Sequence, residues 1–292
     1  MVSQKVNDTV SAKYATWHGA TDPAEMLRGY DAMLPAVLEG YEATEDKVAG
    51  VPGLWLEKPG RDTDRVIVYL HGGGFFAGTA RGYAGLASRI AEEADADVYL
   101  VDFSLAPFPQ PFDETLAVYR ELVSTKRVDP ARTVIVGDSA GAGLGLAILV
   151  ALRDAGEPLP AAFVAMSPWS DLTHSGDSFD SPEGIDPVLT RPIADQSASM
   201  YLGDADPTDI RASAYFADLH DLPPTLVQVG TSEALLSDSL RLAEKLRGAG
   251  VNVDLQVAYE MPHVYQMFVD DFPQAAESLS EAGRFLSRTL DS

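Results

Sequence analysis

The chain has 292 residues, of which 46% are hydrophobic, and a formal net charge of −23. This acidity argues against nucleic acid, anionic membranes and strongly anionic substrates as partners, because no basic cluster offsets it. The chain contains no cysteine, which excludes disulfides, a thiol nucleophile and a cysteine-based metal site.

The N-terminal residues lack the apolar stretch of a signal peptide. The longest apolar run, residues 140–152, is too short and too rich in glycine to span a bilayer. We therefore expect a soluble cytoplasmic protein. The acidic composition suits a salt-adapted protein and an ordinary acidic enzyme equally well.

Residues 1–45 show apolar residues at helical spacing, and Asp22 with Pro23 offers an N-cap and a first helical position. From Lys47 the pattern becomes β, and residues 48–56 predict strands around a Pro52–Gly53 turn. Further strands are predicted at residues 66–70, 98–101, 134–136, 163–166, 226–229 and 253–258, and helices at residues 82–94, 114–123, 144–152, 193–202, 239–247 and 274–290.

This alternation of strands and helices predicts a mostly parallel sheet covered by helices on both faces. Residues 172–212 break the rhythm, since they are rich in Asp, Ser, Gly and Pro. We interpret them as a cap insertion over the carboxyl edge of the sheet. The chain then divides into N-terminal cap helices (1–45), a core in two parts (46–171 and 213–292) and this insertion.

The strongest motif is Gly137-Asp138-Ser139-Ala140-Gly141, which follows a β-branched run and precedes a helical pattern. A strand, G-x-S-x-G and a helix in this order are typical of a nucleophile elbow, which exposes the serine hydroxyl at the end of the strand. The helix N-terminus there favours negative charge. Ser139 is therefore the predicted nucleophile, and Asp138 is expected to face away from it and to hold local backbone.

A second motif, His71-Gly72-Gly73-Gly74, directly follows the strand at residues 66–70. Glycine N–H groups can approach a ligand oxygen closely, so two of them, with the N–H of Ala140, would form an oxyanion hole. We expect His71 to brace this loop by hydrogen bonds.

A serine nucleophile needs a base, and a third group that orients the base. His263 follows the last predicted strand, where the chain order Ser…acid…His places the base. The other histidines fall in the predicted cap, glycine loop, insertion and a later loop: His18, His71, His174 and His220. For the acid we favour Glu233, in the turn after the strand at 226–229; Asp238, a candidate helix N-cap, and Asp171 are the alternatives.

With these residues placed, the sequence resembles the hormone-sensitive-lipase-like family of α/β-hydrolases, the bacterial family IV esterases. The resemblance covers nearly the whole chain and is carried by His71-Gly72-Gly73-Gly74, Asp102 with Leu105-Ala106-Pro107, Gly137-Asp138-Ser139-Ala140-Gly141, Ser167-Pro168-Trp169, Leu222-Pro223-Pro224 and His263. It implies an α/β-hydrolase fold with a mostly parallel eight-stranded sheet and a helical cap.

The resemblance also implies an oxyanion hole of the Gly73, Gly74 and Ala140 N–H groups and hydrolysis of short-chain carboxylic esters. Members are often homodimers, commonly through the edge of the last strand. The sequence departs from the family at the acid, where Glu233-Ala234-Leu235 replaces Asp-x-Leu-x-Asp, and at Phe108, where a glutamate is common.

The predicted reaction is the hydrolysis of short- to medium-chain esters by Ser139, His263 and Glu233 through an acyl-enzyme, which requires no cofactor and no metal. Five residues are candidates either for the substrate pocket or for the core: Phe75, Phe76, Trp169, Tyr201 and Val264. Alternative functions are amide hydrolysis and ligand binding without catalysis, but a receptor would not need both Ser139 and His263. A true lipase is disfavoured because the insertion is too polar for an apolar lid.

Overall fold

The computed structural model describes residues 4–15, 17, 22–180 and 186–291. Its strands are β1 Glu42–Val48, β2 Val51–Glu57, β3 Val66–Leu70, β4 Asp97–Val101, β5 Thr133–Asp138, β6 Ala162–Met166, β7 Thr225–Gly230 and β8 Val253–Ala258. Within these described ranges they form one eight-stranded sheet in the order β1-β2-β4-β3-β5-β6-β7-β8. The pairs β1–β2 and β2–β4 are antiparallel and all others are parallel. The predicted fold class is confirmed.

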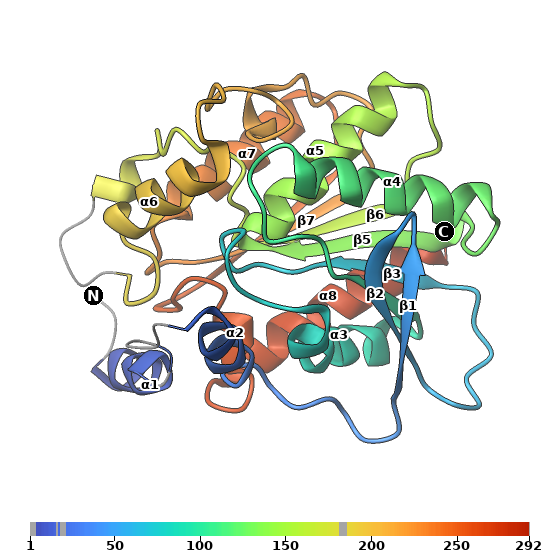
Figure 1. The fold of residues 1–292 in the computed structure, drawn as a ribbon, viewed down its shortest axis with the longest axis horizontal. Helices are drawn as coiled ribbons and strands as arrows, with labels where there is room; N and C mark the ends of the chain where they lie inside the picture. Colours follow the sequence, from blue (N-terminus) through green and yellow to red (C-terminus); the bar gives the residue numbers. More distant parts are fainter. Residues whose placement is uncertain (1–3, 16, 18–21, 181–185, 292) are drawn as a thin grey trace.

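The central strands are buried because helices cover both faces of the sheet. All residues of β3, β5 and β6 are buried, as expected for continuous apolar runs in a parallel sheet. Five long helices follow strands: α3 Ala80–Ala94, α4 Gln110–Ser124, α5 Ser139–Asp154, α7 Leu236–Gly248 and α8 Pro273–Leu290. Figure 1 shows α3 and α8 on one face, and α4, α5 and α7 on the other.

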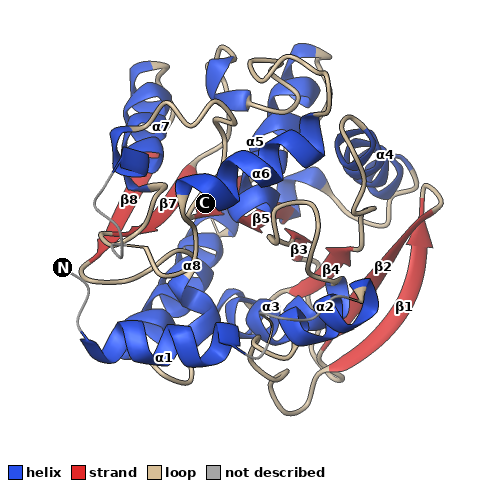
Figure 2. Ribbon diagram, turned by 60° about the vertical axis from the view of Figure 1, so that its left-hand side comes forward, coloured by secondary structure: helices blue, strands red, loops and turns tan. Residues whose placement is uncertain are grey.

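Three further helices are α1 Gln4–Ala15, α2 Pro23–Asp31 and α6 Arg191–Leu202. Figure 2 shows α1 and α2 on the side of α3 and α8, and α6 on the side of α5. The predicted start of α2 is confirmed, because the Asp22 carboxylate accepts the Glu25 N–H at 3.0 Å and Pro23 is the first helical residue. Short 3₁₀ turns occur at Pro130–Arg132, Asp177–Asp180, Ala214–Phe216 and Tyr265–Phe268.

The first hairpin differs from the prediction. The chain turns at Ala49–Gly50, which adopt φ of 51° and 79°, as the two-residue turn between β1 and β2 requires. The predicted turn at Pro52–Gly53 is wrong: both residues lie inside β2, where Pro52 pairs with Lys47. β1 also begins at Glu42, earlier than expected, because this outer strand is mostly exposed and charged and lacks an apolar signature.

Among the described residues, no helix combines the length and the apolar composition that a membrane crossing requires. The apolar side chains form two buried layers, one on each face of the sheet. Neighbouring residues of β3 alternate between these layers, as the pleat demands: Val68 and Leu70 join one, Ile67 and Tyr69 the other. The sheet thus brings the carboxyl ends of β5, β7 and β8 to one edge, with β6 between β5 and β7, and the predicted serine, acid and base lie at this edge.

Candidate active site

Ser139 lies at the sharp junction between β5 and α5. Its backbone has a φ of 49°, a left-handed conformation that is strained for a serine. The turn is so tight that a Cβ on Gly137 would lie 2.6 Å from the Gly141 carbonyl oxygen, and one on Gly141 only 2.1 Å from that of Leu70. Both flanking positions therefore admit only glycine, and the strained turn presents the Ser139 hydroxyl at the sheet edge.

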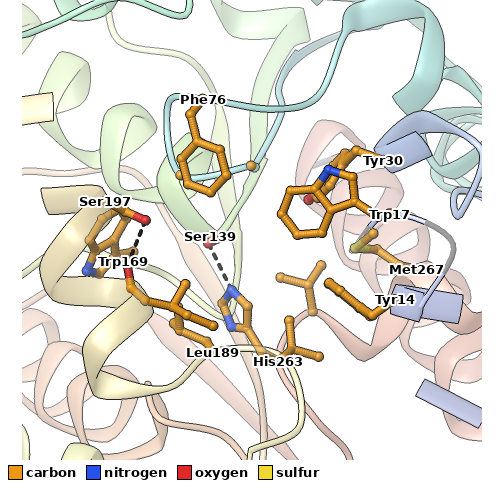
Figure 3. Close-up of a pocket in the computed structure, with 15 residues that line it drawn as sticks. Tyr14, Trp17, Tyr30, Phe76, Ser139, Trp169, Leu189, Ser197, His263 and Met267 are labelled. Carbon is orange, nitrogen blue, oxygen red and sulfur yellow. Dashed lines mark hydrogen bonds between the residues drawn. The ribbon is translucent and has the colours of Figure 1, made fainter. Parts of the chain in front are cut away.

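His263 follows β8 and meets this hydroxyl. Its Nε2 lies 2.9 Å from the Ser139 Oγ, and the imidazole is buried (Figure 3). The next residue, Val264, has a φ of 45° and donates its N–H to the Ser167 hydroxyl at 3.1 Å. The turn that carries His263 is thereby attached to the end of β6.

Glu233 lies behind the imidazole. Its Oε1 is 3.4 Å from the Nδ1 of His263, which is long for a hydrogen bond. Its Oε2 accepts the Ser167 hydroxyl at 2.9 Å and the Gly230 N–H at 2.8 Å. The structure thus brings Ser139, His263 and Glu233 into one hydrogen-bonded row, and Ser167 joins the Glu233 carboxylate to the backbone of Val264, the residue after His263.

The two alternative acids have other partners. Asp238 lies in the first turn of α7 and pairs with Arg241, and Asp171 accepts hydrogen bonds from Thr173, Ser175 and the same arginine. The expectation that Asp238 is an N-cap is wrong, because α7 begins at Leu236 and already includes it. The placement of these residues favours Glu233 as the orienting group.

Asp138 is fully buried and points away from the serine, as expected. Its carboxylate accepts the hydroxyls of Tyr69 at 3.0 Å and Tyr83 at 3.1 Å, and the Gly72 N–H at 3.0 Å. Burial raises the pKa of Asp138 to about 6, although these hydrogen bonds oppose the rise. This carboxylate therefore fixes the start of the glycine loop to the end of β5, next to Ser139.

The glycine loop itself runs along the pocket. Gly73 and Gly74 line it beside Ser139 and have φ values of 103° and 62°, which glycine adopts without strain. His71 stands at the base of the loop, where its Nδ1 lies 2.8 Å from the Gly72 carbonyl oxygen and its ring stacks on Phe103.

The pocket has two apolar walls. Figure 3 shows Tyr14, Trp17, Tyr30 and Met267 on one side of the Ser139–His263 pair, and Trp169 with Leu189 on the other. Of the five pocket candidates from the sequence, Phe76, Trp169 and Val264 are among its lining residues.

Phe75 and Tyr201 lie elsewhere: their rings stack face to face with centroids 3.7 Å apart, and both are buried. The aromatic residues of the N-terminal segment were not among the predicted pocket residues. The sequence does contain a signal for them: Tyr14, Trp17 and Tyr30 lie in the predicted amphipathic cap segment, where aromatic side chains would face the site.

The remaining histidines have roles outside the row. His174 binds Asp195 at 2.7 Å and stacks on Trp169, and His220 is half exposed beside Asp218. His18 lies outside the described residues. Across the described ranges, no group of three or more His, Asp or Glu side chains is arranged to hold a metal ion.

The charges around His263 favour its protonated form. Burial lowers the pKa of the imidazole, but the hydrogen bond and charge of Glu233, with the charges of Asp186 and Asp138, outweigh burial and raise it above its usual value. A base of this kind readily accepts the proton of a nearby hydroxyl, since the carboxylates stabilise the resulting imidazolium.

Comparisons with known proteins identify the family of this fold. A family model described as alpha/beta hydrolase fold matches residues 67–267. An acetyl-hydrolase from Streptomyces hygroscopicus is 37% identical over 235 residues, which cover 80% of this chain and 78% of the relative. An esterase from Acinetobacter venetianus is 35% identical over 243 residues, which cover 82% of this chain and 80% of the relative.

A crystal structure of an esterase from the bacterial hormone-sensitive lipase family matches with a TM-score of 0.92 at 38% identity, covering 99% of this chain and 100% of that chain. The fold and the matched family define the chain as an α/β-hydrolase, a serine hydrolase of the carboxylesterase type. Within that class it belongs to the bacterial hormone-sensitive-lipase-like esterases, and the resemblance seen in the sequence is confirmed.

Proposed function

We propose that this chain hydrolyses short- to medium-chain carboxylic esters, with Ser139 as nucleophile, His263 as general base and Glu233 as the orienting acid. The observation that carries the proposal is the hydrogen-bonded row of these three side chains, of which Ser139 and His263 line an apolar pocket. Such a row activates a serine, because the base removes the hydroxyl proton while the acid stabilises the imidazolium.

The reaction proceeds in two acyl transfers. The Ser139 Oγ attacks the ester carbonyl as His263 takes its proton, and the imidazolium then protonates the departing alcohol, which leaves an acyl-enzyme. His263 next removes a proton from water, whose oxygen attacks the acyl carbon, and the imidazolium returns a proton to Ser139 as the carboxylic acid is released. Glu233 keeps the Nδ1 proton of the imidazole in place throughout.

In both steps the oxyanion would bind the N–H groups of Gly73, Gly74 and Ala140. Gly73 and Gly74 line the pocket at the serine, and Ala140 is the second residue of α5, at its positive end. Each donor of this kind contributes about 3–4 kcal/mol to transition-state stabilisation.

The lining of the pocket suits the binding of small apolar acyl and alcohol groups. Its lining is mostly aromatic and aliphatic, and the hydroxyl of Ser197, one of the lining residues, donates a hydrogen bond to the Ile193 carbonyl oxygen. Such walls bind alkyl and aryl groups by burial, and the described lining residues include no lysine or arginine.

The test is hydrolysis of p-nitrophenyl esters from acetyl to dodecanoyl by wild type and Ser139→Ala. We expect activity to peak at short to medium acyl chains and to fall by about 10⁴-fold or more in the variant, because the attacking oxygen is lost. Circular dichroism on both proteins checks that the variant is folded. A folded wild type that turns over no ester would overturn the proposal, and amide substrates and ligand binding would be tested next.

The same proposal includes a cap formed by residues 1–45 and 172–212, a cytoplasmic location and a homodimer. Residues from α1, α2 and α6 join the pocket wall, which suits a cap. β8 ends the sheet order, and Val257 (45% exposed) and Tyr259 (74%) on or beside it suit a second copy. Light scattering of the wild type checks the dimer.

A further inference from the structure

Asp186, which the reaction above does not use, is a buried carboxylate in the segment between β6 and β7. Its side chain is only 8% exposed, and the ion pairs found among the described residues do not include it. Its Oδ1 accepts the N–H groups of Val188 at 2.9 Å and Leu189 at 3.0 Å, and its Oδ2 accepts that of Ala234 at 2.8 Å. A buried carboxylate without a cation is costly, so three backbone donors are the compensation seen here.

These three donors belong to two functional segments. Val188 and Leu189 line the substrate pocket, whereas Ala234 directly follows Glu233 in the turn after β7. One carboxylate therefore joins the pocket wall to the turn that bears the acid. The two segments are 45 or more residues apart in sequence, so the link depends on the folded insertion.

Asp186 also acts on the charge balance of the site. The groups that face His263 are Glu233 in the turn after β7, Asp186 in the insertion and Asp138 at the end of β5. Those that face Asp186 are His263, Glu233 and, from α1, Tyr14. Burial raises the pKa of Asp186 to about 6, so the group is mostly ionised at neutral pH and attracts a protonated His263.

Resting on the proposed function, we propose that Asp186 is a positioning residue of the active site. It ties the Val188–Leu189 pocket wall to the Glu233 turn and adds a further negative charge to those of Glu233 and Asp138 around His263. The imidazolium formed during catalysis is then stabilised by a carboxylate from the insertion as well as by those of the turn after β7 and the end of β5.

The test replaces Asp186 by Asn and uses Ser178→Ala as a matched control. Asparagine keeps an oxygen for Val188 and Leu189 but turns an amide donor toward the Ala234 N–H, and it removes the charge. Ser178 joins the same insertion to the same turn without a charge, since its hydroxyl bonds the Ala234 carbonyl oxygen and the Ser237 N–H.

The first readout is the pH titration of His263, which is monitored by NMR of the protein labelled with ¹³C-histidine. The His263→Asn variant identifies the signal that belongs to His263. We expect Asp186→Asn to lower the pKa of His263 by roughly half a unit or more, because a nearby negative charge is lost, and Ser178→Ala to leave it unchanged. This readout requires no turnover, so it tests the inference even if ester hydrolysis fails.

The second readout is hydrolysis of p-nitrophenyl butyrate. In Asp186→Asn we expect kcat to fall by about tenfold or more, with the acid limb of kcat/KM moved to lower pH; in Ser178→Ala we expect less than about a threefold fall with an unmoved limb. If Asp186→Asn does not fold, Asp186→Ser serves instead, since its hydroxyl can still accept from Val188 and Leu189. An unchanged His263 titration in the folded variant, or an equal shift in Ser178→Ala, would overturn the inference.

Discussion

Around Ser139 the chain is held by backbone packing, whereas around Glu233 it is held by hydrogen bonds to carboxylates. The elbow fits because Gly137 and Gly141 let carbonyl oxygens come closer than any Cβ would allow. The acid turn fits because Glu233 and Asp186 accept N–H and O–H groups from separate segments.

The difference teaches which parts of the site respond to pH and which to volume. Steric fit does not titrate, so Ser139 should keep its place at any pH at which the protein is folded. A network of carboxylates changes charge with pH, and the placement and basicity of His263 change with it. Substitutions that add atoms should therefore harm the elbow most, and those that remove charge should harm the acid side most.

Among the substitutions that test this difference between the two sides of the site, the largest effect is expected for Glu233→Gln. The Ser167 and Gly230 donors require an oxygen, so the new amide group would face the Nδ1 of His263 and hold the imidazole in the wrong tautomer. We expect kcat for a short p-nitrophenyl ester to fall by about 10³-fold. The acid limb of kcat/KM should also move to lower pH, because Glu233 raises the pKa of His263.

The matched control for this acid is Asp238→Asn, which removes a buried carboxylate of α7 that pairs with Arg241. Its kcat should stay within about threefold of wild type, since it has no bond to the imidazole. If the two variants lost activity equally, the acid would have to be reassigned.

A smaller effect, on stability, is expected for Gly141→Ala. Alanine suits a helix better than glycine by about 1 kcal/mol, but here its Cβ would lie 2.1 Å from the Leu70 carbonyl oxygen. We expect the free energy of unfolding in urea to fall by about 3 kcal/mol, because backbone on both sides must move.

Gly248→Ala is the control, since that helical glycine of α7 has no atom within 4 Å of the added Cβ. It should leave the free energy of unfolding unchanged or raise it by up to about 1 kcal/mol. Equal stabilities of the two variants would contradict the steric account of the elbow.

The smallest effect concerns Asp138, the one carboxylate of the elbow side. Its folded pKa of about 6 lies above the ordinary value of 3.8, so its stabilising contribution is present below 3.8 and is lost as pH rises through 6. Asparagine does not titrate. Acidification from pH 8 to pH 5 should therefore stabilise wild type relative to Asp138→Asn by about 1 kcal/mol, measured by urea unfolding at both values.

If the difference in the free energy of unfolding between wild type and Asp138→Asn stays constant with pH, Asp138 titrates normally in the folded state. The two proteins must be compared because other buried groups titrate in the same pH range. Burial lowers the pKa of both His71 and His174, and their contribution is lost as pH falls below 6.5.

Much of this site is predictable because its residues follow strands with strong apolar signatures. Ser139, Glu233 and His263 each lie just after such a strand, and parallel strands bring their carboxyl ends to one edge. Asp186 gives no such signal: it stands in a polar insertion and its partner Ala234 lies 48 residues onward.

Two predictions that differ from the structure, the start of the first strand and the direction of Phe75, have local causes. The strand that begins at Glu42 is exposed and charged on the outside of the sheet, so no apolar alternation marks it. Phe75 is turned away from the pocket by a backbone φ of 66°, and it stacks on Tyr201. Side-chain direction after a run of glycines depends on conformations that a letter sequence does not specify.

The pocket wall is assembled from residues that lie far apart in the chain, from Tyr14 in α1 to Met267 after β8. On the ribosome these two residues are made roughly 10–50 s apart, at about 5–20 residues per second. The aromatic side chains of the first helices are therefore translated long before the segments they pack against. On the proposed function, an ester bond could be cleaved only after His263 and Met267 have been made and have packed against the first helices.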